Sequence, residues 1–139
     1  MNGFEVFEHT SDLGVAARGE TLEDSLASLL RGVFSAIADP SAVALDRDWI
    51  IRAAGDDLEE ATVRLVNEAL FVHDTEGALC SGVSVKVSRS DADETVVIEA
   101  RCSGEVFDPS RHTIKRYIKA ATYHGIKVTS HEVRLVLDV

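Results

Sequence analysis

Apolar residues recur at helical spacing in two stretches of the chain, which predict two helices. The first stretch follows Thr21, a good N-cap residue, and Asp24 three positions later completes a variant of the capping box. Asp39-Pro40 stops this helix, because the residue before a proline disfavours helical backbone. The second helix is predicted over residues 58–73, after the turn Gly55-Asp56-Asp57 has supplied N-cap oxygens. The apolar positions are Leu22, Leu26, Leu29, Leu30, Val33, Phe34 and Ile37 in the first stretch, and Leu58, Ala61, Leu65, Ala69 and Val72 in the second.

Alternation of apolar and polar residues predicts strands in the rest of the chain. Residues 83–87 alternate valine with polar side chains, and a turn at 90–93 joins them to a hairpin partner at 95–102. A long loop is predicted at 104–112, and a turn at 10–12 separates the first two strands. Those two strands cover residues 4–8 and 14–18, and the others cover 42–54, 116–122, 126–129 and 132–139.

The order of these elements is β-β-α-β-α followed only by strands. Strand-helix-strand occurs twice, which hints at an internal duplication, although the residues show no clear self-similarity. Hairpins without regular βαβ alternation favour an α+β fold, with two helices packed on a mostly antiparallel sheet. The length of 139 residues and the hydrophobic fraction of 45% suit a single domain over residues 1–139.

The formal net charge of −10 narrows the choice of partners. Nucleic-acid binding requires Lys and Arg to neutralise phosphates, so no direct nucleic-acid contact is expected unless one basic face is hidden in the average. Cations and basic protein surfaces match the charge better, and the charge also maintains solubility whatever the partner.

The N-terminal residues, the short apolar runs and the cysteines predict a cytoplasmic location without a membrane partner. The N-terminal residues lack the basic and apolar regions of a signal peptide, and no apolar run approaches the length needed to cross a bilayer. Cys80 and Cys102 stand in apolar, strand-like surroundings outside any C-x-x-C motif, so we expect two buried, reduced thiols.

Carboxylates are the main candidates for chemistry, because no nucleophile elbow, P-loop, dinucleotide fingerprint or H-E-x-x-H motif is present. The sequence stops at Asp138-Val139 on an apolar strand, which places a side-chain carboxylate beside a main-chain α-carboxylate. Hard divalent cations bind clustered oxygens of this kind. A further ligand is needed, and Asp12 is the candidate because first and last strands often pair in small sheets. The alternatives are a solvated terminus and an aspartate that bonds its own turn.

The five histidines do not share a metal-binding spacing. A lone histidine is more often a packed or surface residue than a ligand. His9 and His124 lie at predicted element ends beside polar residues, so these two are kept as candidate functional side chains.

Five stretches, in the same order along the chain, resemble the archease family. The first is Phe7-Glu8-His9-Thr10-Ser11-Asp12-Leu13-Gly14, which is similar to an opening D-H-T-A-D-x-G motif. Any one stretch would be a weak signal, but five in order over essentially the whole chain are specific. The other four are Asp74-Thr75-Glu76-Gly77, Gly104-Glu105-Val106-Phe107-Asp108-Pro109-Ser110-Arg111-His112, Lys119-Ala120-Ala121-Thr122-Tyr123-His124 and Leu135-Val136-Leu137-Asp138-Val139.

The resemblance implies a non-enzymatic function. Archeases are accessory proteins of the RtcB-type RNA ligase, which joins tRNA exon halves and other broken RNAs. They promote guanylylation of the ligase, support its repeated turnover and broaden its choice of nucleoside triphosphate. The implied fold is a compact α+β domain in which one strand-helix-strand-strand module is nested within another.

The resemblance also implies roles for particular residues. Asp12, Asp138 and the carboxylate of Val139 correspond to a divalent-metal site, with Ca²⁺, Mg²⁺ or Mn²⁺ as the ion. Lys119 resembles a residue needed for ligase activation through a carboxylate or phosphate, and its alternative is an exposed surface charge. His9 and His124 are assigned to activation with it. Departures from the family pattern occur at Glu8, Ser11 and His73, and none of these is a proposed ligand.

Two functions of other classes stay open from the residues alone. A stand-alone metal-dependent hydrolase would use Asp12, Asp138 and His124, and would act on RNA or nucleotides without a partner. A general chaperone-like module would bind many unfolded clients. The predicted core faces account for the apolar residues, so no surplus apolar surface supports the chaperone-like alternative.

Overall fold

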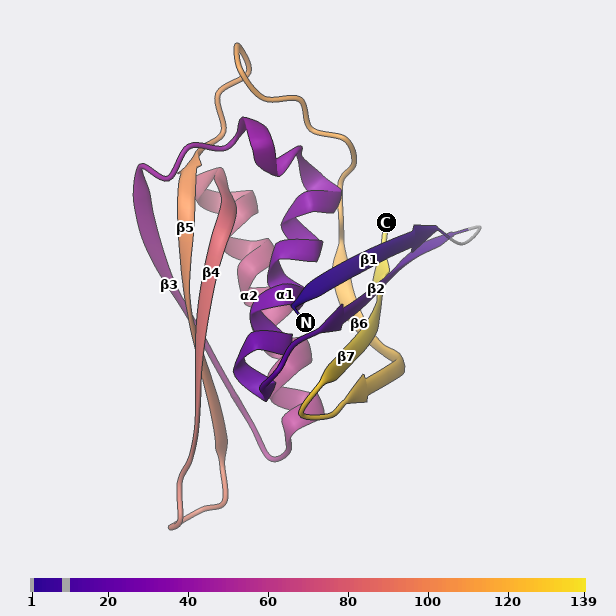
Figure 1. Cartoon of the computed structure of the whole chain (residues 1–139), viewed down its shortest axis with the longest axis vertical. Helices are drawn as coiled ribbons and strands as arrows, with labels where there is room; N and C mark the ends of the chain where they lie inside the picture. The colour runs from indigo at the N-terminus through magenta and orange to yellow at the C-terminus, as the bar shows by residue number, and fades with distance from the viewer. Residues whose placement is uncertain (1, 9–10) are drawn as a thin grey trace.

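The computed structural model describes residues 2–8 and 11–139, and it holds two helices between two antiparallel sheets (Figure 1). The helices are α1 (Leu22–Ile37) and α2 (Leu58–Glu76). The strands are β1 (Gly3–Glu8), β2 (Asp12–Arg18), β3 (Arg47–Gly55), β4 (Ala78–Arg89), β5 (Val96–Val106), β6 (Ala120–Val128) and β7 (Glu132–Asp138). Each helix contacts both sheets: α1 packs on β2 and β4, and α2 packs on β3 and β6. No helix in the described part of the chain combines the length and apolar character needed to cross a membrane.

One four-element module occurs twice, the second copy inside the first. The inner module is β3-α2-β4-β5, and it is inserted between α1 and β6 of the outer module, β2-α1-β6-β7. In both sheets the last strand of the module lies in the middle, giving the orders β3-β5-β4 and β2-β7-β6, with β1 added beside β2. The predicted α+β class and the nested modules are therefore confirmed, with the strands divided between two sheets.

Side chains near the helix ends explain where α1 and α2 begin. Thr21 accepts a hydrogen bond from the Asp24 N–H at 3.0 Å, as the capping pattern predicted, and Asp57 accepts one from the Glu60 N–H at 2.8 Å. The second helix is longer than predicted and ends at Glu76 instead of residue 73. Gly77 adopts the left-handed conformation at φ 73° and donates its N–H to the His73 carbonyl, which is the geometry of a glycine C-cap.

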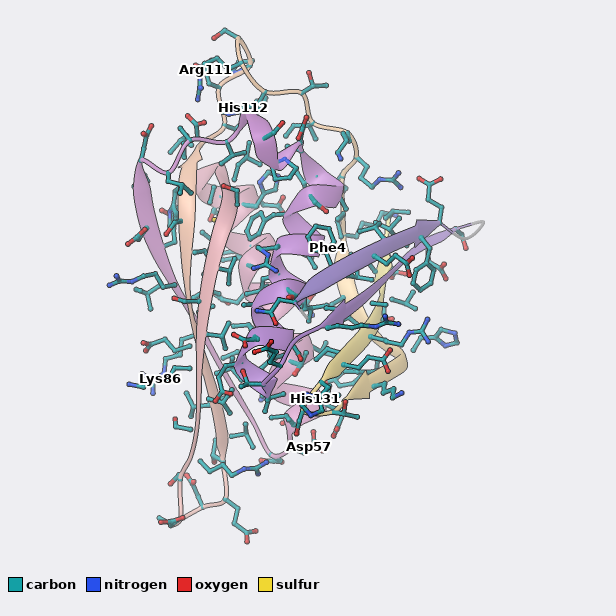
Figure 2. The ribbon with its side chains drawn as sticks, viewed as in Figure 1. Phe4, Asp57, Lys86, Arg111, His112 and His131 are labelled. Carbon is teal, nitrogen blue, oxygen red and sulfur yellow. The ribbon has the colours of Figure 1, made fainter. Side chains whose placement is uncertain are left out.

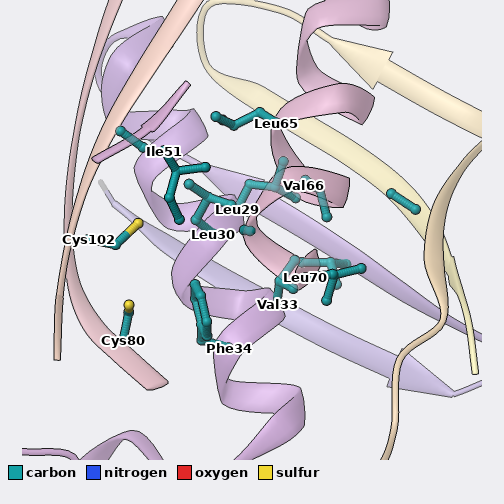
Figure 3. Packing of buried hydrophobic residues seen from close by; sticks show 14 of the residues in the cluster. Leu29, Leu30, Val33, Phe34, Ile51, Leu65, Val66, Leu70, Cys80 and Cys102 are labelled. Carbon is teal, nitrogen blue, oxygen red and sulfur yellow. The ribbon is translucent and has the colours of Figure 1, made fainter. Parts of the chain in front are cut away.

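The hydrophobic core lies between the two sheets and contains side chains of both helices and of both sheets. Leu29 and Leu30 of α1 and Leu65 and Val66 of α2 are all fully buried (Figure 3). Beside them lie the free thiols of Cys80 and Cys102, which are buried as predicted. A hydrogen bond with Cys102, together with burial, raises the pKa of the Cys80 thiol well above its usual range, so the Cys80 thiol stays protonated at neutral pH.

The strand predicted at 42–54 is wrong in its first part. Pro40–Ala42 forms a short 3₁₀ turn, and the strand begins only at Arg47. The Glu105 carboxylate accepts the Ala44 N–H at 2.6 Å, so this segment bonds to a side chain instead of joining the sheet ladder.

The two strands predicted at 116–122 and 126–129 are in fact one strand, β6, whose register shifts between Thr122 and Lys127. The preceding residues, 107–119, form no strand. The N–H of Lys115 donates to the Ile37 carbonyl at the end of α1, at 2.7 Å, which withdraws it from any ladder. The hairpin of β4 and β5 is longer than predicted, so the loop expected at 104–112 begins at residue 107.

The predicted turn at 10–12 ends earlier than expected, because Asp12 is already the first residue of β2. His9 and Thr10 lie outside the described residues.

Candidate functional site

Asp12 and Asp138 lie directly opposite each other in the ladder between β2 and β7. Opposite residues of antiparallel strands project from the same face of the sheet, with Cβ atoms roughly 4.5–5.5 Å apart. Their neighbours Leu13 and Leu137 also form a pair, and both are fully buried on the side of the helices. The two carboxylates therefore project from the outer face, away from the core.

The alternation of β2 and β7 fixes this placement. Along β2, Leu13, Val15 and Ala17 are fully buried against the helices, so the residues between them belong to the outer face. Gly14 occupies that face next to Asp12, and the ring of Phe7 lies so close that a Cβ on Gly14 would approach it to 2.2 Å. The guanidinium of Arg134 stands over the same ring, 5.7 Å from its centre. The ring of Phe7, with Arg134 over it, thus covers the outer face of the sheet beside the carboxylates.

On the other side of Asp138 stands the start of β6. Ala120 pairs with Asp138, and the Lys119 N–H donates to the Asp138 carbonyl at 2.8 Å. Ala120 has the smallest side chain that still keeps the strand regular, so it leaves the outer face open next to the Asp138 carboxylate. The exposed Lys119 is brought to the same end of the sheet as Asp12, Asp138 and Val139.

Asn67 of α2 bonds to the start of β6 beside the carboxylates, and no pattern in the sequence indicates this contact. Its Oδ1 accepts the Ala121 N–H at 2.7 Å, and its Nδ2 donates to the Ala121 carbonyl at 3.5 Å. A side-chain amide thus takes the place of a neighbouring strand on this part of β6. Asn67 follows the buried Val66 in a helix whose apolar pattern it does not interrupt, so only the structure reveals the contact.

The outer-face carboxylates suit a hard divalent cation. Like charges directly opposite in a ladder destabilise it, and a shared cation reverses that effect. Oδ1 of Asp12 exposes less than 1 Å² to solvent, so this oxygen faces the protein and not bulk water. No three His, Cys, Asp or Glu side chains of residues 2–8 and 11–139 gather as a metal site, so a cation here would also need main-chain oxygens such as those of Val139.

The remaining candidates lie apart from the carboxylates. His124 stands in the irregular part of β6, four residues beyond Ala120, which corresponds to roughly 13 Å along a strand. It is exposed, and its N–H donates to Thr122 Oγ1 at 3.3 Å. The structure therefore does not bring His124 together with Asp12 and Asp138. His9 falls among the residues that are not described.

The chain matches the model of the Archease protein family (MTH1598/TM1083) over residues 4–139. It belongs to the archease family. Protein archease of Pyrococcus furiosus is 31% identical over 128 residues, which cover 92% of this chain and 89% of that protein. Protein archease of Methanopyrus kandleri is 34% identical over 135 residues, covering 97% and 95% of the two chains.

The archease fold is also seen in a solved relative. The solution structure of Methanobacterium thermoautotrophicum protein 1598 matches this chain with a TM-score of 0.75 and 25% sequence identity, over 99% of both chains. The family resemblance found in the sequence is confirmed. Archease membership supports an accessory role in RNA processing and implies a partner within that machinery.

Proposed function

We propose that this chain activates an RtcB-type RNA ligase, promoting guanylylation and repeated turnover of the ligase in tRNA splicing and RNA repair, without catalysing a reaction itself. The observation that carries the proposal is the pairing of Asp12 with Asp138 on the open face of a sheet in an archease-family chain. Two carboxylates held opposite each other in a strand ladder fit the placing of a hard cation.

The proposed site uses the carboxylates of Asp12 and Asp138 and a main-chain oxygen of Val139 to hold a divalent cation. A bound cation there supplies positive charge that offsets phosphate groups during nucleotidyl transfer. The β2–β7 ladder holds both carboxylates in position before any partner arrives, so little ordering is needed on docking. The exposed ammonium of Lys119 contributes a second positive charge at the same end of the sheet, available to a phosphate or carboxylate of the ligase.

The test is a guanylylation assay with the purified ligase of the same organism and GTP. We expect wild-type chain to accelerate labelling of the ligase, and Asp138→Asn to lose most of that acceleration. Asp91→Asn is the matched control, because Asp91 is an exposed aspartate in the turn between β4 and β5. Full acceleration by Asp138→Asn would contradict the proposal. The same chain incubated with RNA or GTP alone tests the hydrolase alternative, which requires turnover without ligase.

A further inference from the structure

Basic residues are segregated in one part of this acidic chain. Residues 109–131 contain five of the 14 Lys and Arg residues and none of the 24 Asp and Glu residues. The net charge of −10 therefore hides a positive segment. A basic face hidden in the average charge is the condition under which an acidic chain can still bind nucleic acid.

Ion pairs neutralise three of these five cations. Arg111 pairs with Glu105, Arg116 with Glu8, and Lys127 with Glu132. The other two cations, Lys115 and Lys119, are exposed, and neither forms an ion pair within the described ranges 2–8 and 11–139. Asp39 lies near enough to interact with the charge of Lys115, but its Oδ1 is hydrogen-bonded to Ser41.

The chain that carries Lys115 and Lys119 is extended and firmly held. Their N–H groups donate to the carbonyls of Ile37 and Asp138, at 2.7 and 2.8 Å. Between them Ile118 is buried, at 3% exposure, whereas Tyr117 is 61% exposed. Along residues 115–119 the exposed Lys115, Tyr117 and Lys119 alternate with side chains that are more buried, and we call these three exposed residues the basic strip. Figure 1 shows this segment running between β5 and β6 along the outside of the helices.

We propose that the basic strip binds single-stranded RNA, with Lys115 and Lys119 on phosphates and Tyr117 stacked on a base. An exposed aromatic ring between two unpaired cations is the arrangement with which proteins hold single strands irrespective of sequence. An acidic protein surface would use the two cations but would gain little from the ring, so the ring favours RNA. The two lysines are roughly 13 Å apart along an extended chain, which limits the contact to a few nucleotides.

The surroundings of the basic strip support this assignment. The main chain is already fixed, so binding does not have to order a loop. Tyr123, further along the chain on β6, is another exposed ring, at 54% exposure. The carboxylates of Asp12 and Asp138 lie at the same end of the sheet as Lys119 and repel phosphate there, and added salt screens that repulsion. The inference concerns the chain alone and does not depend on ligase activation.

The test is fluorescence anisotropy of a fluorescein-labelled single-stranded oligouridylate, titrated with the purified chain at low ionic strength. We expect Tyr117→Ala to weaken binding at least about fivefold, the lower end of the effect of losing one base stack. Lys115→Glu replaces a phosphate-binding cation with an anion, and we expect a loss of at least about fivefold there too. Lys86→Glu is the control, since Lys86 is an exposed lysine on the other sheet, on the opposite side of the molecule (Figure 2). Two phosphate contacts predict a slope of roughly −1.4 for log affinity against log salt.

Three results would overturn the proposal. The first is an absence of oligouridylate binding by the wild-type chain. The second is an equal loss of affinity in Lys86→Glu, which would indicate diffuse attraction. The third is displacement of the RNA by a polyglutamate peptide at similar concentration, with Tyr117→Ala unaffected, which would assign the strip to an acidic protein surface. Circular dichroism of each variant separates loss of binding from loss of fold.

Discussion

Asp12 and Asp138 occupy the same rung of the β2–β7 ladder, on the face of the sheet turned away from the helices. Two carboxylates directly opposite each other repel, so strand pairing at this rung opposes side-chain charge. A cation bound between them converts the repulsion into attraction. Folding and cation binding at this rung are therefore linked.

Removal of one carboxylate should separate the two effects. With Ca²⁺ in large excess, we expect the melting temperature of the wild-type chain to rise, since a ligand at 100 times its dissociation constant stabilises the folded state by about 2.7 kcal/mol. Asp12→Asn should abolish this rise, and in EDTA it removes the repulsion across the rung. Asp91→Asn should keep the full response. Differential scanning calorimetry measures these melting temperatures. An equal response to Ca²⁺ in Asp12→Asn and Asp91→Asn would argue against the site.

Asn67 should prove to be a structural support of this end of the sheet. Asn67→Ala removes the acceptor of the Ala121 N–H, and we expect a loss of about 1–3 kcal/mol in the free energy of unfolding, the cost of a buried group left unsatisfied. Asn67→Asp keeps that acceptor and should lose less. Urea denaturation measures both, and hydrogen exchange of the Ala121 amide locates the effect. Unchanged protection of that amide in Asn67→Ala would show that the contact is not maintained in solution.

The helices could be predicted because their signals are local. The hydrogen bonds from Asp24 to Thr21 and from Glu60 to Asp57 join residues three positions apart, and such short spacings can be read directly from the sequence. The predicted end of α2, at residue 73, is too early because the polar run before Gly77 resembles a loop. Only glycine there adopts the required positive φ readily.

The arrangement of strands and the support of the site could be predicted only in part. The sequence suggested that the first and last strands bring Asp12 near Asp138, and the register places the two in one rung. The extended course of residues 107–119 depends on remote acceptors such as the Ile37 carbonyl, and no local pattern announces them. The bond between Asn67 and Ala121 spans 54 positions, so it follows from the packing of α2 on β6 alone.

A buried network around Glu105 should anchor the start of the loop after β5. Glu105 is 6% exposed and accepts hydrogen bonds from Arg111, from the Ala44 N–H and from Nε2 of His112 at 3.0 Å. Nδ1 of His112 faces the Asp108 N–H at 2.9 Å and so must be an acceptor, which leaves the proton on Nε2. Arg111 and His112 are seen together at this end of the molecule in Figure 2.

Glu105→Ala leaves those donors without their acceptor, and we expect it to lower the free energy of unfolding by roughly 3 kcal/mol. Glu105→Gln keeps the shape and one acceptor oxygen, so its loss should be smaller. Glu99→Ala on the same strand is the control, because its ion pair with Arg52 is exposed and should contribute less than about 1 kcal/mol. Guanidinium denaturation ranks the three variants. Equal losses for Glu105→Ala and Glu99→Ala would show that the network adds no stability.

The motif Asp-Pro-Ser occurs twice, at Asp39-Pro40-Ser41 and Asp108-Pro109-Ser110, and both copies form the same turn. In each, Oδ1 of the aspartate accepts the serine N–H at 2.9 Å and the serine hydroxyl at 2.8 Å. These bonds favour the ionised carboxylate, so the pKa of Asp39 and the pKa of Asp108 both lie below the ordinary value of 3.8.

The sign of the resulting pH dependence follows from the lowered values. A carboxyl whose pKa is lower in the folded than in the unfolded state stabilises the fold above the unfolded pKa, and this contribution is lost as the pH falls through the folded pKa. We therefore expect both turns to weaken only below about pH 4. Carbon-detected NMR titration of the carboxyl groups should show Ser41→Ala raising the pKa of Asp39 while that of Asp108 stays low, and Ser110→Ala doing the reverse. Because each variant contains the other turn unchanged, a shift of both carboxyls together would mean that a global change, and not the serine hydroxyl, sets their pKa.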